Sequence, residues 1–165
     1  MVARMREPGT PRITVVMPAY NAAKTLELTY NRIPAIVSDV ILVDDHSRDE
    51  TASIASGLGL RVIQHPHNVG YGGNQKTCYM EALQRQAGVV VMLHPDGQYD
   101  PELITDMVRP LLEDRADMVL GSRFLPPCDP RASGMPLWKF LANRALTMAE
   151  NACMGTQFSE CHTGY

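Results

Sequence analysis

Residues 40–51, VILVDDHSRDET, contain the pattern that decides the fold. The run from Val40 to Val43 is short and entirely apolar, and it ends at two carboxylates followed by polar residues. A run of this length without polar interruptions is typical of a strand that is buried on both faces of a parallel sheet. The stretch therefore predicts a buried strand over 40–43 that feeds a crossover helix over 49–57.

The same alternation continues on both sides of this stretch. Four further short runs rich in Val and Ile predict strands, over residues 13–17, 61–64, 89–93 and 118–120. Segments with apolar residues three and four apart predict helices, over residues 22–33, 49–57, 71–86, 101–114 and 137–154. A proline-rich loop is expected over 124–136. Strands that alternate with helices predict an α/β fold, Rossmann-like, with a mostly parallel sheet and helices on both faces.

Composition narrows the class of protein. The 165 residues include 15 Lys and Arg against 18 Asp and Glu, a net charge of −3, and 45% are hydrophobic. This balance, without a basic run, gives no reason to expect nucleic acid as a partner. No stretch reaches the roughly 18 to 20 consecutive apolar residues of a membrane-spanning helix. Residues 1–11 lack the apolar segment of a secretory signal and are expected to form a flexible tail, with a single domain over 12–165.

The four cysteines do not form a metal-binding pattern. Cys78, Cys128, Cys153 and Cys161 are widely separated and contain no CxxC pair. Free thiols in a reducing, cytoplasmic compartment are expected, with disulfide bonds as the alternative.

The first predicted strand ends at Pro18-Ala19-Tyr20-Asn21. In open parallel sheets the ligand crevice lies beyond the carboxyl ends of the strands, so this turn is a candidate binding surface. Asn21 is also expected to cap the following helix. The turn lacks the GxGxxG pattern of dinucleotide-binding enzymes, which argues against a dinucleotide cofactor.

The second strand ends at Asp44 and Asp45. Two adjacent carboxylates at the end of a buried strand must be hydrogen-bonded or paired with a ligand. Asp45 could accept a hydrogen bond from a ring N–H of a nucleobase, and a purely structural pair is the alternative. Just beyond them, Ser47 and Glu50 are expected to form a capping box for the next helix.

The fourth strand leads into His94-Pro95-Asp96-Gly97-Gln98. Side chains two residues apart on an extended segment lie on one side, so His94, Asp96 and Gln98 together suggest a divalent metal site. Such an ion, bridging a diphosphate, needs only one or two protein carboxylates. The alternative is a simple turn, after which Asp100 caps a helix that has Pro101 at its first position.

Two weaker features could hold phosphate. Residues 67–74, HNVGYGGN, form a glycine-rich turn that opens a helix and presents free backbone N–H groups. Arg123 follows the last predicted strand and could pair with a phosphate or with a surface carboxylate.

Read in order, the segments VVMPAYN, ILVDDHSRDET, HNVGYGGNQKT, VVVMLHPDGQYDP and VLGSRF resemble the inverting family 2 glycosyltransferases of the GT-A fold. Within that family the set is similar to the polyprenyl-phosphate hexose transferases of the dolichol-phosphate mannosyltransferase type. The likeness extends over residues 12–165 and ends at His162-Thr163-Gly164-Tyr165, before an Arg of the family pattern. The resemblance therefore implies a domain that is incomplete at its C-terminus.

The resemblance also implies roles for individual residues. Those of the nucleotide site would be Pro18, Ala19, Tyr20, Asn21, Asp44, Asp45, Asn68, Gly70, Asn74 and Pro95. The metal ligands would be His94, Asp96 and Gln98. The catalytic residues would be Asp96, Arg123 and Glu160. The residues that contact the acceptor phosphate would be Arg123, Trp138 and Lys139. His94 stands where the family's D-x-D motif has its first Asp, and a nitrogen ligand favours Mn²⁺ over Mg²⁺.

The implied activity is transfer of a hexose, with inversion, from a UDP- or GDP-linked sugar to a lipid phosphate or a glycan, assisted by Mn²⁺ or Mg²⁺. The expected setting is the cytoplasm, at the cytoplasmic face of a membrane, with peripheral membrane contact and a homodimer as expected associations. Two alternatives are a truncated, non-catalytic nucleotide-binding module and a sugar nucleotidyltransferase. The latter is ranked lower because it should carry a basic, glycine-rich loop where this chain has Pro18 to Asn21.

Overall fold

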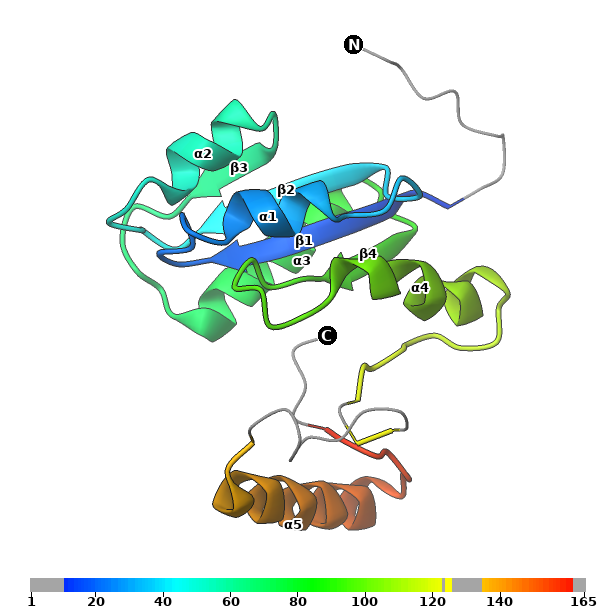
Figure 1. Ribbon diagram of the computed structural model, residues 1–165. Coiled ribbons are helices and arrows are strands. Elements are labelled where there is room, and N and C mark those ends of the chain that lie inside the picture. The colour runs from blue at the N-terminus through cyan, green and yellow to red at the C-terminus, as the bar shows by residue number, and fades with distance from the viewer. Residues whose placement is uncertain (1–10, 123, 126–134, 162–165) are drawn as a thin grey trace. The chain divides into compact units, whose positions relative to one another are not determined.

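The computed structural model describes residues 11–122, 124–125 and 135–161 (Figure 1). The chain groups into two compact units, Met1–Asp117 and Met118–Tyr165. The single domain expected over residues 12–165 stays a prediction, and residues 1–10 of the expected tail lie outside the described residues.

The first unit is built on a parallel four-stranded sheet. Its strands are β1 (Ile13–Ala19), β2 (Asp39–Asp44), β3 (Arg61–Gln64) and β4 (Val89–Met92), in the order β3-β2-β1-β4. Val16 of β1 pairs with Ile41 on one side and with Met92 on the other. The chain steps outward from β1 to β3 and then returns to the opposite side of β1, so the winding direction reverses between β1 and β4.

Helices cover both faces of this sheet (Figure 1). They are α1 (Leu26–Asn31), α2 (Thr51–Gly57), α3 (Tyr71–Gln84) and α4 (Ile104–Leu112), the last preceded by a 3₁₀ turn, η1 (Pro101–Leu103). α3 packs against β1 and β2, while α1, α2 and α4 lie on the other face. The predicted α/β architecture with helices on both faces is confirmed.

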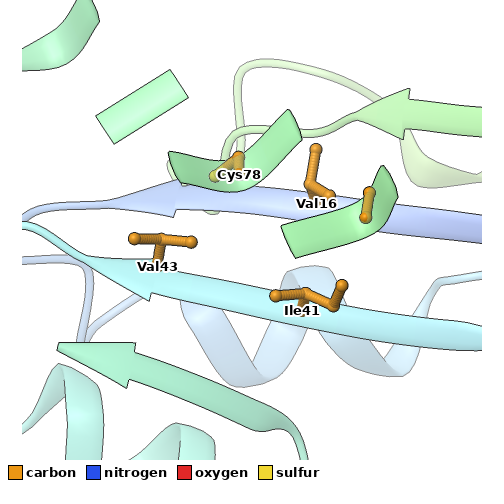
Figure 2. Packing of buried hydrophobic residues seen from close by; sticks show 5 residues of the cluster. Val16, Ile41, Val43 and Cys78 are labelled. Carbon is orange, nitrogen blue, oxygen red and sulfur yellow. The ribbon is translucent and has the colours of Figure 1, made fainter. Parts of the chain in front are cut away.

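The core between α3 and the sheet is small and tightly closed. Val16, Ile41 and Val43 from the strands meet Cys78 and Ala82 of α3 (Figure 2), and each of these residues is fully buried. Burial raises the pKa of the Cys78 thiol to about 12. Removing aliphatic side chains from water stabilises a fold by roughly 1.5 to 3 kcal/mol each, which makes this cluster the anchor of α3.

Two secondary-structure predictions are wrong. Residues 118–120 form no strand, and Met118 is 64% exposed. A strand needs a hydrogen-bonded neighbour, and in the described part of the chain β4 pairs only with β1. The first helix begins at Leu26 and not at residue 22. Residues 23–25 form a turn, and the backbone N–H groups of Ala22 and Ala23 donate to Thr51 and Asp49 in the segment after β2.

The second unit contains α5 (Leu137–Met154), as predicted. It ends at Gly155, whose φ of 66° is the left-handed conformation that suits glycine after a helix. Most of the loop expected over 124–136 lies outside the described residues. None of the helices described here is both long and apolar enough to cross a membrane.

Three of the four cysteines lie within the described residues. Cys78, Cys153 and Cys161 carry free thiols, and Cys128 lies outside the described residues.

Candidate functional site

A cavity of about 290 Å³ opens at the carboxyl ends of the strands. Its lining comes from the ends of β1, β2 and β4 and from the first turn of α3. This is the point at which the winding direction of the sheet reverses, where open α/β sheets place their ligands. All of the lining belongs to the first unit.

The cavity gathers ten of the residues that the sequence suggested. They are Pro18, Ala19, Tyr20, Asp45, Asn68, Gly70, Asn74, His94, Pro95 and Asp96. Three others, Asn21, Asp44 and Gln98, are described by the structure but do not line the cavity. Residues that are far apart in the chain thus meet in one concave surface.

Asn21 orders the β1 turn and does not cap α1. Its backbone has a φ of 52°, its side-chain oxygen accepts the N–H of Arg48 at 2.9 Å, and its own N–H donates to the Ser47 hydroxyl. The residue that precedes α1 is Thr25. The expected cap is therefore wrong, and Asn21 instead ties the end of β1 to the loop that follows β2.

Asp44 is used within its own loop. Its carboxylate accepts hydrogen bonds from the backbone N–H and the hydroxyl of Ser47. The predicted capping box between Ser47 and Glu50 is therefore absent, and Asp49 takes over by accepting the N–H of Thr51. Asp44 is thus hydrogen-bonded within its own loop and does not line the cavity, and its contact with a nucleotide stays a prediction.

Asp45 is equally buried, with 3% of its surface exposed, but it lines the cavity. Oδ1 accepts the N–H of Val69 at 2.9 Å, and Oδ2 accepts the N–H of Gly70 at 3.0 Å. The ring of His65 lies 2.9 Å from Oδ1. Burial alone raises the pKa of Asp45, but the hydrogen bonds from Val69, His65 and Gly70 outweigh it, so that the pKa lies below its ordinary value. The site therefore holds a carboxylate anion at neutral pH.

The first turn of α3 forms another wall of the cavity. Gly70 precedes the helix with a φ of 81°, a conformation that favours glycine, and the side-chain oxygen of Asn68 accepts its N–H. Asn74 donates to the carbonyls of Val43 at 3.1 Å and Ala19 at 3.4 Å, which couples the helix to the ends of β1 and β2. Helix N-termini of this kind present N–H groups to anions.

The segment after β4 forms a turn that carries His94 and Asp96 into the cavity. Asp96 Oδ1 accepts the N–H of Gln98 at 2.9 Å, and Gly97 has a φ of 75°, so the turn proposed as an alternative is present. Even with this turn, the side chains of His94 and Asp96 line the cavity. The hydroxyl of Thr25 donates to the carbonyl of Pro95 and fixes the turn against the segment that leads into α1.

His94 sits in an aromatic environment. Its ring stacks on Tyr71 with centroids 5.4 Å apart, and its Nε2 lies 3.1 Å from the Tyr71 hydroxyl. Burial lowers the pKa of His94, and the nearby Asp96 carboxylate opposes this only in part. The imidazole is therefore neutral at pH 7, which leaves a nitrogen lone pair able to bind a metal.

The structure supplies few metal ligands by itself. Among the described residues, no three His, Cys, Asp or Glu side chains are grouped closely enough to hold an ion. Asp96 and His94 are the two candidate ligands that share the cavity lining, whereas Gln98 lies outside it. A pair of this kind fits an ion such as Mg²⁺ or Mn²⁺ only when other oxygen atoms complete its coordination.

Sequence reasoning missed two lining residues and one supporting residue. Ala22 and Tyr71 line the cavity, and His65 supports Asp45 from behind. The position of Tyr71 directly after Gly70 in the glycine-rich turn could have pointed to it. No local pattern marks His65, because its partners lie on other elements.

The remaining predicted residues belong to the second unit. Trp138 is 67% exposed, and the ammonium of Lys139 lies 5.5 Å from its ring centroid. Glu160 is buried and accepts a hydrogen bond from Asn143 at 3.0 Å. Arg123 lies outside the described residues.

Known proteins share this sequence pattern. The sequence model of glycosyl transferase family 2 matches residues 14–162. UDP-N-acetylglucosamine–dolichyl-phosphate N-acetylglucosaminyltransferase of Methanococcus voltae is 28% identical over 170 residues, 92% of this chain and 67% of that protein. Undecaprenyl-phosphate mannosyltransferase of Micrococcus luteus is 31% identical over 122 residues, 70% of this chain and 49% of that protein. The chain thus spans about half to two thirds of the length of these curated relatives.

A solved structure shares the arrangement of the sheet and helices. It is glucosyl-3-phosphoglycerate synthase from Mycobacterium tuberculosis in complex with Mn²⁺ and UDP-glucose, with a TM-score of 0.53 and 26% identity. The match covers 62% of this chain and 39% of that protein.

Proposed function

Because this chain belongs to glycosyl transferase family 2, we propose that it transfers a hexose from a nucleoside diphosphate sugar to an acceptor. The observation that carries the proposal is the cavity at the reversal point of the sheet, where Asp45, His94 and Asp96 line one space of about 290 Å³. A polyprenyl phosphate is the proposed acceptor, since two relatives are named for dolichyl-phosphate and undecaprenyl-phosphate.

The nucleotide would lie along this cavity. Asp45 is a buried carboxylate with a lowered pKa, which suits an acceptor for a ring N–H of the base. The diphosphate would lie toward Asp96, where negative charge needs a counterion. UDP is the first candidate carrier, because the similar solved synthase was crystallised with UDP-glucose, and GDP is the second.

A divalent cation is proposed at the diphosphate. Asp96 offers a carboxylate oxygen and His94 a neutral imidazole nitrogen, and phosphate oxygens and water would complete the coordination. When bound, such an ion would neutralise charge on the leaving diphosphate. The mixed nitrogen and oxygen ligands favour Mn²⁺ over Mg²⁺.

The acceptor decides whether a general base is needed. A lipid phosphate is already an anion and can attack the anomeric carbon, with inversion, without losing a proton. A hydroxyl acceptor would need a carboxylate, for which Glu160 is the candidate. Arg123, Trp138 and Lys139 are proposed to hold phosphate groups of the acceptor or the donor.

The proposed setting is the cytoplasmic face of a membrane, where a lipid phosphate would be met. α5 supports peripheral contact because Leu137, Trp138 and Leu141 are each more than half exposed beside Lys139. The same face could join two copies in a homodimer. Co-sedimentation with anionic liposomes tests the first association, and light scattering at several protein concentrations tests the second.

The test of the function is calorimetric titration with UDP, GDP and CDP, with and without Mn²⁺. We expect one nucleotide to bind, and Mn²⁺ to tighten its binding. Asp96→Asn should remove most of that metal-dependent gain, about tenfold, because it removes the carboxylate that is proposed to bind the metal. Asp106→Asn, on the exposed surface of α4, is the matched control and should leave binding unchanged.

The outcomes separate the candidate functions. Equal metal dependence in wild type and Asp96→Asn would contradict the metal site, and the absence of any nucleotide binding would contradict the proposed function. Binding without transfer of labelled sugar to a polyprenyl phosphate would favour a non-catalytic nucleotide-binding module. Formation of sugar nucleotide from sugar 1-phosphate and a nucleoside triphosphate would favour a nucleotidyltransferase.

A further inference from the structure

His65 lies directly behind the carboxylate that faces the cavity. It follows β3, and its backbone N–H donates to the carbonyl of Asp44 at 2.9 Å, so its position is fixed by the sheet. Its ring reaches Asp45 Oδ1 through Nδ1 and the hydroxyl of Thr77, on α3, through Nε2, both at 2.9 Å. The ring therefore joins the ends of two strands to α3 at a place that does not line the cavity.

The hydrogen bonds that the Asp45 carboxylate accepts show how the contact with His65 limits the positions left for a ligand. An ionised carboxylate only accepts, and it has about four lone-pair positions. Val69 and His65 occupy Oδ1, and Gly70 occupies one position on Oδ2. As far as the described residues go, one acceptor position remains, on Oδ2, for a molecule in the cavity that Asp45 lines.

The ionised state of Asp45 also determines which nitrogen of the His65 ring carries the hydrogen. Because the facing carboxylate has no proton to give, Nδ1 must carry the hydrogen of this contact. The Thr77 hydroxyl holds the other end of the ring and sets its rotation. The two backbone donors come from the segment Val69-Gly70, where Val69 is 41% exposed, whereas the side chain of His65 is 12% exposed and is held between Asp45 and Thr77.

We propose that His65 is a positioning residue, which holds the Asp45 carboxylate so that its remaining Oδ2 position meets the ring N–H of a nucleobase. This inference rests on the proposed function of the cavity. His65 does not touch the ligand, and it acts on base recognition alone, not on the diphosphate.

The test compares binding of a whole nucleotide with binding of its phosphate part. Calorimetric titrations with Mn²⁺ would use UDP, GDP and inorganic pyrophosphate. For His65→Ala we expect about tenfold weaker binding of the preferred nucleotide, the size of one hydrogen bond to a charged group, and unchanged binding of pyrophosphate. Gln64→Ala, at the exposed last residue of β3 directly before His65, is the matched control and should change neither.

Two further variants separate positioning from a general loss of structure. His65→Asn places an amide nitrogen near the position of Nδ1, so it should restore most of the nucleotide affinity. In an Asp45→Asn background, His65→Ala should add less than a twofold loss, because the group through which it acts has already been altered. NMR of the His65 ring nitrogens should show the hydrogen on Nδ1 in the wild type.

The following results would overturn the proposed role of His65. Equal weakening of nucleotide and pyrophosphate, full affinity in His65→Ala, or an undiminished effect in the Asp45→Asn background would overturn the positioning role. If wild type bound pyrophosphate and no nucleotide, the proposed function itself would fail, and the role of His65 with it. If His65→Ala does not fold, as thermal unfolding would reveal, His65→Asn must retain affinity and His65→Gln must lose it, or the role is overturned.

Discussion

Asp44 and Asp45 show how adjacent, identical residues acquire different chemistry. Both are 3% exposed at the end of β2, yet Asp44 turns to Ser47 in its own loop and Asp45 turns to Val69, Gly70 and His65. Strand geometry sends successive side chains to opposite faces, so one of the two must meet α3 and the cavity. The sequence pointed to Asp45 as the carboxylate for a nucleobase, and of the two residues it is Asp45 that lines the cavity.

The lowered pKa of Asp45 predicts a loss of stability in acid. A folded-state pKa below the ordinary value of 3.8 contributes stability that is complete above that value and is lost as the pH falls through the folded pKa. We expect the free energy of unfolding of wild type to fall as the pH drops below about 4, and to fall less in Asp45→Asn. Urea unfolding from pH 6 to pH 3 measures this, with Glu27→Gln as a control for net charge. Parallel acid dependence in wild type and Asp45→Asn would contradict the assignment.

The first turn of α3 illustrates constraint at the scale of an element. The helix and its glycine-rich start could be predicted from the sequence, but Gly72 and Gly73 look equivalent there. In the structure a Cβ on Gly72 would meet nothing within 4 Å, whereas one on Gly73 would lie 2.8 Å from Cγ2 of Val69 and 3.1 Å from its Cβ. Val69 is the residue whose N–H donates to Asp45, so Gly73 permits the close approach that shapes the site.

Alanine at these two glycines should therefore have opposite effects. Gly72→Ala should stabilise the protein by about 0.5 kcal/mol, because alanine loses less conformational entropy in a helix. Gly73→Ala should not stabilise the protein and should weaken nucleotide binding several-fold. The added methyl group would push the Val69 segment away from Asp45. Thermal unfolding and calorimetry on the two variants check both effects. Tighter or unchanged nucleotide binding in Gly73→Ala would count against this role of Val69.

At the scale of the whole molecule, the predicted GT-A fold is confirmed by the likeness to a solved glycosyltransferase. The cavity is confined to residues 18–96, within the first unit. Trp138, Lys139 and Glu160 belong to the second unit, along with Arg123. The proposed function thus assigns nucleotide binding and acceptor handling to different parts of the chain.

This division predicts the behaviour of a shortened chain. Residues 1–117 should bind the preferred nucleotide within about threefold of the full chain, since all residues that line the cavity are retained. Sugar transfer should disappear, because the proposed acceptor residues are missing. Calorimetry and a transfer assay on both chains measure this, with circular dichroism to verify folding. Nucleotide affinity lost from a folded fragment would show that the second unit completes the donor site.

The alternation of strands and helices and the four strands of the sheet could be predicted from the sequence within a few residues, and with the family resemblance so could ten of the residues that line the cavity. The elements follow from local periodicity, and the site residues follow from the rule that parallel strands end at the ligand crevice together with the family resemblance. The folded chain was needed to show that residues 118–120 are not a strand, that Ser47 binds Asp44 and not Glu50, and that His65 supports Asp45. The physical reason is that hydrogen-bond partners distant in sequence compete with local ones, and only the folded chain shows which of them lies within reach.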